Sequence, residues 1–118
     1  MSGRRILVIE DDADSAEVLQ LGLEALGQHV AVAKDGAAGI ALATETKPDV
    51  VLVDLGLPGL DGYEVVRQIR SALGESVRVI ALTGYGRAED RRRTAEAGFD
   101  GHLMKPIGTE AILALLPD

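Results

Sequence analysis

Carboxylates gather where two apolar runs of this sequence end. Glu10, Asp11 and Asp12 follow the run 5–9, and Asp54 ends the run 50–53. Neither run alternates apolar with polar residues, which is typical of strands buried on both faces of a parallel sheet. The carboxyl ends of such strands meet at one edge of the sheet, where open α/β sheets bind their ligands. Taken alone, Asp54 fits a structural strand-end aspartate as well as a functional residue.

Two more polar groups follow predicted strands further along the chain. Thr83 ends the run 77–82, and Lys105 follows the run 101–104. Carboxylates about 4 Å apart repel one another by ~1 kcal/mol in water and by more near a protein surface, so a cation must offset them. Lys105 supplies one charge, and a divalent ion that prefers oxygen ligands, Mg²⁺ or Mn²⁺, would supply the rest.

Together these groups suit phosphoryl transfer. Asp54 is the candidate nucleophile, the metal and Lys105 neutralise the phosphoryl oxygens, and Thr83 donates its hydroxyl. Gly84, beside Thr83, leaves room for a phosphoryl group. No single residue of the set is specific to phosphoryl transfer, so the prediction depends on their joint placement at the ends of the predicted strands.

Strands and helices alternate five times along the chain. Apolar periodicity and capping residues predict strands at 5–9, 30–33, 50–53, 77–82 and 101–104, and helices at 14–26, 35–46, 63–73, 87–97 and 109–116. Ala16, Leu19, Leu23 and Leu26 are expected to face inward from the first helix, and Ala38, Ala41 and Leu42 from the second. The fourth helix has few large apolar side chains and should be the least firmly packed. This alternation predicts an α/β fold, a doubly wound parallel sheet with helices on both faces.

Composition limits the class of protein. At 118 residues the chain should form a single domain, 1–118, and its lack of cysteine excludes disulfides and thiolate chemistry. A net charge of -7 and 3% aromatic residues argue against direct binding of nucleic acid. No apolar stretch approaches the ~18 residues of a membrane span, and no signal peptide is evident, so we expect a cytoplasmic protein.

The chain resembles a receiver domain of two-component response regulators. The matching segments are 6–12, 53–62, 81–84 and 105–106, which together span nearly the whole chain. The resemblance implies the flavodoxin-like (βα)5 sheet of order 2-1-3-4-5. It also implies that Asp54 accepts a phosphoryl group from the phosphohistidine of a histidine kinase or a histidine phosphotransfer protein.

The resemblance further implies roles for the surrounding residues. Glu10 and Asp11 would hold Mg²⁺ together with Asp54 and the backbone carbonyl of Gly56, while Asp12 lies nearer to solvent. Lys105 would pair with the phosphoryl oxygens, and Pro106 would follow a cis peptide bond.

His102 departs from the family pattern, which commonly has Tyr or Phe three residues before the lysine. We hypothesise that His102 acts with Thr83 as the switch, with a pH-sensitive bias. The alternative is a surface histidine on an edge strand. Gly56 and Tyr85 flank the site at positions that influence hydrolysis of the aspartyl phosphate in this family, and the sequence does not give the direction of their net effect.

The remaining polar and aromatic residues favour ordinary structural roles. Arg91–Arg93 are better explained as a solvated helix face than as a partner-binding patch. We interpret Tyr63 and Phe99 as packing residues, and Asp61 and Asp100 as turn formers.

Three alternative functions are weaker. A flavodoxin-like cofactor binder needs a phosphate-friendly loop where Glu10, Asp11 and Asp12 stand. An aspartate-nucleophile phosphatase usually needs a second carboxylate two residues after the nucleophile, where Gly56 stands. A degenerate receiver used only as a scaffold does not explain the intact set of site residues.

We therefore expect a signalling switch domain, monomeric or weakly dimeric, whose self-phosphorylation and self-dephosphorylation take place at Asp54. It would be a stand-alone regulator or one domain of a larger protein such as a hybrid histidine kinase. Its downstream protein target is not evident from the sequence.

Overall fold

Five parallel strands form one sheet in the order β2-β1-β3-β4-β5, as the sequence predicts. The computed structural model describes residues 3–57, 59, 61–83, 88–104 and 108–114. The strands are β1 (Arg5–Ile9), β2 (His29–Ala33), β3 (Val50–Asp54), β4 (Arg78–Thr83) and β5 (Gly101–Met104). The helices are α1 (Ala13–Ala25), α2 (Gly36–Thr46), α3 (Gly62–Leu73), α4 (Ala88–Ala97) and α5 (Thr109–Leu113), with a 3₁₀ turn at Gly74–Ser76.

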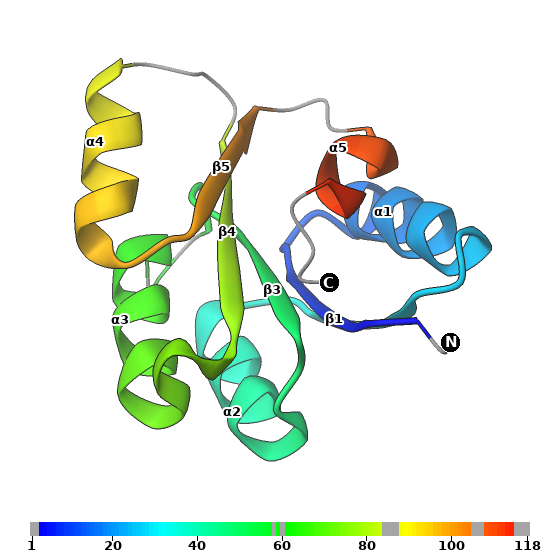
Figure 1. Ribbon diagram of the computed structural model, residues 1–118, viewed down its shortest axis with the longest axis horizontal. Coiled ribbons are helices and arrows are strands. Elements are labelled where there is room, and N and C mark those ends of the chain that lie inside the picture. Colours follow the sequence, from blue (N-terminus) through cyan, green and yellow to red (C-terminus); the bar gives the residue numbers. More distant parts are fainter. Residues whose placement is uncertain (1–2, 58, 60, 84–87, 105–107, 115–118) are drawn as a thin grey trace.

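The helices cover both faces of the sheet (Figure 1). Alternate residues of each central strand enter two separate cores, because successive side chains of a strand point to opposite faces. One core joins β1, β3 and β4 to α2 and α3, with Val51 and Val53 at its centre. The other joins the same strands to α1 and α5, with Val50 and Leu52 at its centre. Burial on both faces explains why these strands carry continuous apolar runs.

The first and third helices begin at aspartate caps. Asp12 accepts a hydrogen bond from the Ser15 amide at 3.1 Å, and Asp61 accepts one from the Glu64 amide at 3.0 Å. Asp61, which we expected to be a turn former, therefore caps α3. Each cap satisfies an amide that has no partner within the helix and sets where the helix leaves the end of a strand.

The predicted inner face of α2 is wrong in part. Asp35 caps this helix as expected, through a 2.7 Å hydrogen bond from the Ala38 amide. Gly36, Gly39 and Ala43 are buried, however, whereas Ala38 and Ala41 are exposed and Leu42 is only half-buried. Glycine is not counted as apolar in a hydropathy pattern, but because it has no side chain it lets this helix approach the sheet closely.

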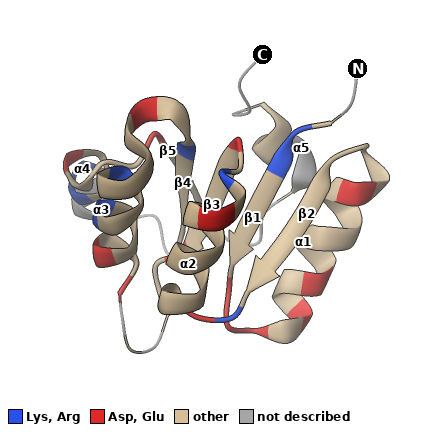
Figure 2. Cartoon of the chain, turned by 90° about the horizontal axis from the view of Figure 1, so that it is seen from below, with Lys and Arg blue, Asp and Glu red and all other residues tan. Residues whose placement is uncertain are grey.

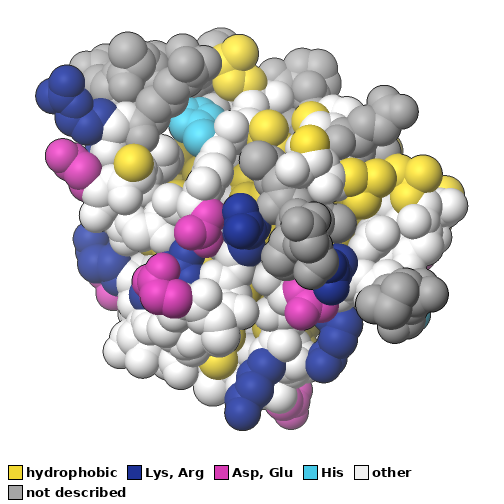
Figure 3. All heavy atoms as spheres, viewed as in Figure 1, with side chains coloured by type: hydrophobic (Ala, Val, Ile, Leu, Met, Phe, Trp, Pro, Cys, Tyr) yellow, Lys and Arg dark blue, Asp and Glu magenta, His cyan; other side chains and the backbone are white. Residues whose placement is uncertain are grey.

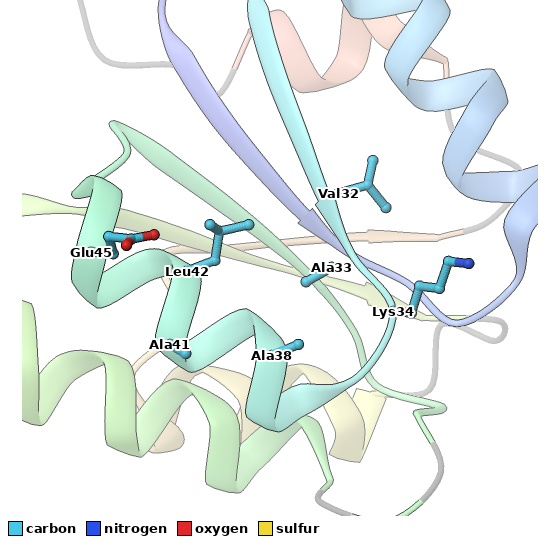
Figure 4. A pocket seen from close by; sticks show the side chains of 7 residues that line it. All are labelled: Val32, Ala33, Lys34, Ala38, Ala41, Leu42 and Glu45. Atoms are coloured by element: carbon cyan, nitrogen blue, oxygen red, sulfur yellow. The ribbon is translucent and has the colours of Figure 1, made fainter.

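A shallow groove lies at the outer edge of the sheet, between β2 and α2. Its volume is about 660 Å³, and Figure 4 shows Leu42 and Ala38 of α2 on one side and Val32 of β2 on the other. Lys34 and Glu45 are its charged lining residues. The groove contains none of the predicted site residues.

Helix α1 carries apolar side chains on its outer surface as well as on its inner one. Val18 is 69% exposed and Leu21 60% exposed, and hydrophobic side chains gather over this part of the molecule in the space-filling view (Figure 3). Leu26, which we expected to face inward, is 45% exposed and caps the helix. The chain turns there because Gly27, with φ of 90°, adopts a left-handed conformation.

Helix α4 is held by aromatic and cationic contacts. The guanidinium of Arg93 lies 4.0 Å from the centre of the Tyr63 ring, and Tyr63 meets Phe99 edge-on at 6.3 Å. Tyr63 and Phe99 are thus packing residues, as expected. Arg92 and Arg93 are exposed, and the side chain of Arg91 lies outside the described residues.

In the part of the chain that the structure describes, we find no helix with the length and apolar character required to cross a lipid bilayer.

Candidate functional site

The site lies at the carboxyl edge of the sheet, where β1 and β3 end side by side. Parallel pairing of these strands aligns Ile9 with Val53, so Glu10 and Asp54 are the next residues on two adjacent strands. Asp11 comes directly after Glu10. Figure 2 shows acidic residues (red) gathered where β1 ends and α1 begins.

Three of the predicted carboxylates come together. Oxygen atoms of Glu10, Asp11 and Asp54 all lie within 4.8 Å of one another. Glu10 is 1% exposed and Asp54 is 6% exposed, whereas Asp11 faces solvent. Two buried carboxylates and one exposed carboxylate make a site that is shielded on the protein side and open on the other. Such a set of oxygen atoms matches the ligands of a hard divalent cation.

The backbone holds these carboxylates in place. The Gly56 amide donates a hydrogen bond to Asp54 Oδ1 at 2.9 Å, and the Asp12 amide donates one to Glu10 Oε2 at 3.2 Å. Gly56 is exposed, and a methyl group at its Cα would lie 3.5 Å from Asp54 Oδ1, which is ordinary contact. The Gly56 position therefore leaves the approach to Asp54 uncrowded.

The side chain of Asp12 caps helix α1. Its side chain is exposed and accepts hydrogen bonds from both the amide and the hydroxyl of Ser15, the latter at 2.6 Å. The resemblance implies that Asp12 lies nearer to solvent, and in the structure both Asp12 and Asp11 are exposed whereas Glu10 is buried. The sequence analysis did not identify the cap, although an aspartate directly before an apolar helical periodicity is a recognisable start signal.

Thr83 lies one strand further along the same edge. Strand β4 pairs with β3 so that Asp54 aligns with Leu82, and the Leu55 amide donates to the Leu82 carbonyl at 2.9 Å. Thr83 is the next residue and is 5% exposed. Its hydroxyl therefore belongs to the same edge as the Asp54 carboxylate.

His102 contacts Thr83 from the neighbouring strand. Its Nε2 atom lies 3.0 Å from Thr83 Oγ1, and the ring is half-buried. His29, the second histidine, is exposed at the start of β2. The structure thus places His102, and not His29, beside a predicted site residue.

Four predicted site residues, Gly84, Tyr85, Lys105 and Pro106, lie outside the described residues. The structure therefore brings together Glu10, Asp11 and Asp54 as a cluster and places Thr83 with His102 on the adjoining strands.

Comparison with known proteins agrees with this architecture. A family model described as "Response regulator receiver domain" matches residues 6–117. The transcriptional regulatory protein PrrA of Mycobacterium leprae is 39% identical over 114 residues, which are 97% of this chain and 48% of that protein. The regulator RpaA of a Synechocystis strain is 36% identical over 93% of this chain and 46% of its own length. The chain thus spans about half the length of these curated relatives.

Solved structures give the same result. The receiver domain of the sensor histidine kinase PA1611 from Pseudomonas aeruginosa, solved with magnesium in its active-site cleft, superposes with a TM-score of 0.86 at 33% identity. That match covers 97% of this chain and 94% of the other. A response regulator from Burkholderia pseudomallei with a phosphorylated aspartic acid and a calcium ion gives a TM-score of 0.89 at 32% identity, over 97% of this chain and 66% of the other.

The five-stranded sheet and the match over residues 6–117 lead to one conclusion: this chain belongs to the response regulator receiver domain family, the signalling switch domains of two-component systems.

Proposed function

We propose that this domain accepts a phosphoryl group on Asp54 from a phosphohistidine, in a reaction that requires Mg²⁺. The observation that carries the proposal is the cluster of Glu10, Asp11 and Asp54, whose oxygen atoms lie within 4.8 Å of one another beside a buried strand end. Asp54 ends β3, and the Gly56 amide orients its carboxylate. A nucleophile fixed in this way reacts without first being ordered.

The residues present fit a divalent cation. Glu10, Asp11 and Asp54 supply three carboxylates, the backbone carbonyl of Gly56 is the fourth protein ligand that we propose, and water completes the shell of a Mg²⁺ ion. Mn²⁺ suits the same ligands. When bound, the ion neutralises negative charge on the transferring phosphoryl oxygens. The magnesium ion in the PA1611 receiver structure supports this proposal by similarity.

In the proposed transfer, an Asp54 carboxylate oxygen attacks the phosphorus of the phosphohistidine. The new P–O bond forms as the P–N bond breaks, and the leaving imidazole keeps the electron pair and takes up a proton. Thr83 donates its hydroxyl to one phosphoryl oxygen, and Lys105 pairs with another. Hydrolysis reverses the modification when water attacks the phosphorus and the P–O bond to Asp54 breaks.

We infer that the donor is a histidine kinase or a histidine phosphotransfer protein. Phosphorylation would then change the surface that a downstream protein recognises. The phosphorylated aspartic acid in the Burkholderia pseudomallei structure, a protein 32% identical to this chain, is consistent with such a reaction here.

The test is incubation with acetyl phosphate and Mg²⁺, followed by mass spectrometry of the intact protein and of its peptides. We expect one phosphoryl group on the wild-type chain, located at Asp54, and none without the metal. Asp54→Asn should abolish the adduct. Asp61→Asn is the matched control, since Asn caps α3 as well as Asp does. No adduct on the wild type, or an undiminished adduct on Asp54→Asn, would contradict the proposal.

A further inference from the structure

A hydrogen bond links the site to β5. Thr83 Oγ1 on β4 and His102 Nε2 on β5 lie 3.0 Å apart. The strands pair so that His102 aligns with Ala81, two residues before Thr83, and residues two apart on a strand face the same side of the sheet. Ala81 belongs to the core beneath α2 and α3, so this bond lies on that face of the sheet.

The direction of this bond depends on the protonation of the ring. A threonine hydroxyl has one proton to donate, whereas Nε2 of a neutral imidazole is a donor in one tautomer and an acceptor in the other. When Nε2 accepts, the proton of Thr83 is directed to His102. When Nε2 carries a proton, the ring donates to Oγ1, and the hydroxyl proton is available to an acceptor on its other side. In the doubly protonated ring, Nε2 is always a donor.

An acceptor on that side is what the proposed reaction creates. Asp54 ends the strand adjacent to β4, and a phosphoryl group on it brings oxygen atoms with additional negative charge to the edge that Thr83 shares. Thr83 donates to such an oxygen only when its proton is not directed to His102. Thr83 therefore cannot donate to a phosphoryl oxygen while Nε2 of His102 accepts its proton.

We propose that His102 is a positioning residue: by accepting a proton it turns the Thr83 hydroxyl toward Asp54 and favours the phosphorylated state. This inference rests on the proposed function, because it requires a phosphoryl group at Asp54. It differs from a switch that depends on movement of the ring, since the exchange of donor and acceptor needs no change in side-chain position.

The charges around the bond act in both directions: the carboxylates of the site favour a protonated imidazole, whereas the Mg²⁺ ion and Lys105 of the proposed reaction oppose it. Of the ionisable side chains that the structure describes at this edge, Asp54 is on β3, and Glu10 and Asp11 follow β1 one strand further away. Strand β4 begins with Arg78 at the opposite end of the sheet, and on α4 the described charged residues Arg92, Arg93 and Glu96 are exposed. Added negative charge at Asp54 favours a protonated imidazole.

A pH dependence follows from reciprocity. If a proton on His102 favours the phosphoryl group, the phosphoryl group must favour the proton to the same extent. The complex then holds more protons than the free domain, so a phosphoryl mimic binds more tightly as the pH falls. The change should fall in the pH range in which histidine side chains titrate, well above the range of Asp and Glu.

The experiment measures protonation of the His102 ring by NMR titration of the ¹⁵N-labelled full chain between pH 5.5 and 8.5. The titration is carried out with Mg²⁺, with and without saturating beryllofluoride. We expect the midpoint of His102 titration to rise when beryllofluoride binds, by at least half a pH unit. A rise of one pH unit corresponds to about tenfold tighter binding at low pH than at high pH, so half a unit is about threefold.

Variants distinguish the positioning role of His102 from a general effect of nearby charge on its protonation. Thr83→Ser keeps the hydroxyl and should keep the rise in midpoint, whereas Thr83→Val, of similar shape, should reduce it at saturating mimic. His102→Gln, which does not titrate in this range, should bind beryllofluoride with nearly constant affinity from pH 6 to 8. His29→Gln is the matched control, because it removes the other histidine of the chain, and it should behave as the wild type.

The outcomes distinguish this inference from the proposed function. If beryllofluoride binds and the His102 midpoint does not rise, or rises equally in Thr83→Val, the positioning role is wrong and phosphoryl acceptance at Asp54 stands. If affinity follows pH equally in His102→Gln, the pH dependence does not come from His102, and the inference is again wrong. If beryllofluoride does not bind the wild type in the presence of Mg²⁺, both proposals fail.

Discussion

At the scale of single residues, repulsion within the carboxylate cluster lowers the stability of the domain, and a bound cation would reduce this repulsion. Glu10 and Asp54 are buried beside the exposed Asp11, and their oxygen atoms lie within 4.8 Å. Like charges at this separation repel by several kcal/mol near a protein surface, of the order of 332/(εr) with an effective ε of about 20. The cluster therefore lowers the stability of the metal-free domain, and the cation that we propose would reduce this cost.

Mg²⁺ should stabilise the domain in a concentration-dependent way. A single site stabilises by about 2.7 kcal/mol when free ligand reaches 100 times its Kd. Asp11→Asn should raise the stability of the metal-free domain, because it removes one charge, and should weaken Mg²⁺ binding by about tenfold or more. Thermal unfolding at a series of Mg²⁺ concentrations measures both effects.

The control for this prediction is Asp14→Asn, which removes an exposed carboxylate from the first turn of α1. It should leave the response to Mg²⁺ unchanged. A response of Asp11→Asn equal to that of the wild type would show that the cluster does not bind the ion.

At the scale of secondary-structure elements, Arg70 joins four segments at the end of the molecule opposite the site. Its Nε donates to the Gly98 carbonyl at 3.0 Å, and its Nη1 donates to the Gly74 carbonyl at 2.9 Å and to the Val77 carbonyl. Its Nη2 pairs with Asp100, whose carboxylate also accepts from the Val79 amide at 2.8 Å. Asp100, which we expected to be a turn former, therefore connects β4 to α3 through this arginine.

Arg70→Met should destabilise the domain by about 2–4 kcal/mol, because three carbonyls and a carboxylate lose a partner in a half-buried position. Chemical denaturation measures the free energy of unfolding. Arg67→Met, on the same helix, is the matched control. The guanidinium of Arg67 lowers the pKa of Glu64 through a hydrogen bond, but solvent screens this exposed pair. Equal effects of the two substitutions would contradict the role of Arg70.

At the scale of the whole molecule, two layers of helices cover one sheet, and the distance of α2 from the sheet depends on a glycine. A methyl group on Gly39 of α2 would lie 2.3 Å from Ile9 Cδ1 and 2.7 Å from Ile9 Cγ1. Ile9 is fully buried in β1, directly before Glu10. The packing of α2 therefore bears on the strand that carries the carboxylates.

Gly39→Ala should destabilise the domain by about 1–3 kcal/mol, because the core has no room for the methyl group. In an exposed helix interior the same substitution stabilises by about 1 kcal/mol, so the expected sign is opposite to that of helix propensity. Ala37→Gly, at an exposed position of α2, measures the propensity term in this helix. A Gly39→Ala variant more stable than the wild type would show that α2 does not pack as described.

Much of this fold follows from local sequence patterns. The five strands and five helices occur where apolar runs, periodicity and caps predict them, and their alternation specifies the parallel sheet and its edge. The errors concern which face of a helix is buried: Ala38, Ala41 and Leu26 were expected to face inward and are exposed. Which side of an alanine-rich helix is buried depends on the fit of glycine against a neighbouring strand, and hydropathy does not record that fit.

The sequence by itself predicted Glu10, Asp54 and Thr83 as site residues, because each stands at the end of a strand that an apolar run specifies. Tertiary structure alone decided which of them touch. It brought Glu10, Asp11 and Asp54 within 4.8 Å, assigned Asp12 to a helix cap and joined His102 to Thr83. The physical reason is that strand order and register, set by packing across the whole sheet, fix distances between residues far apart in the chain.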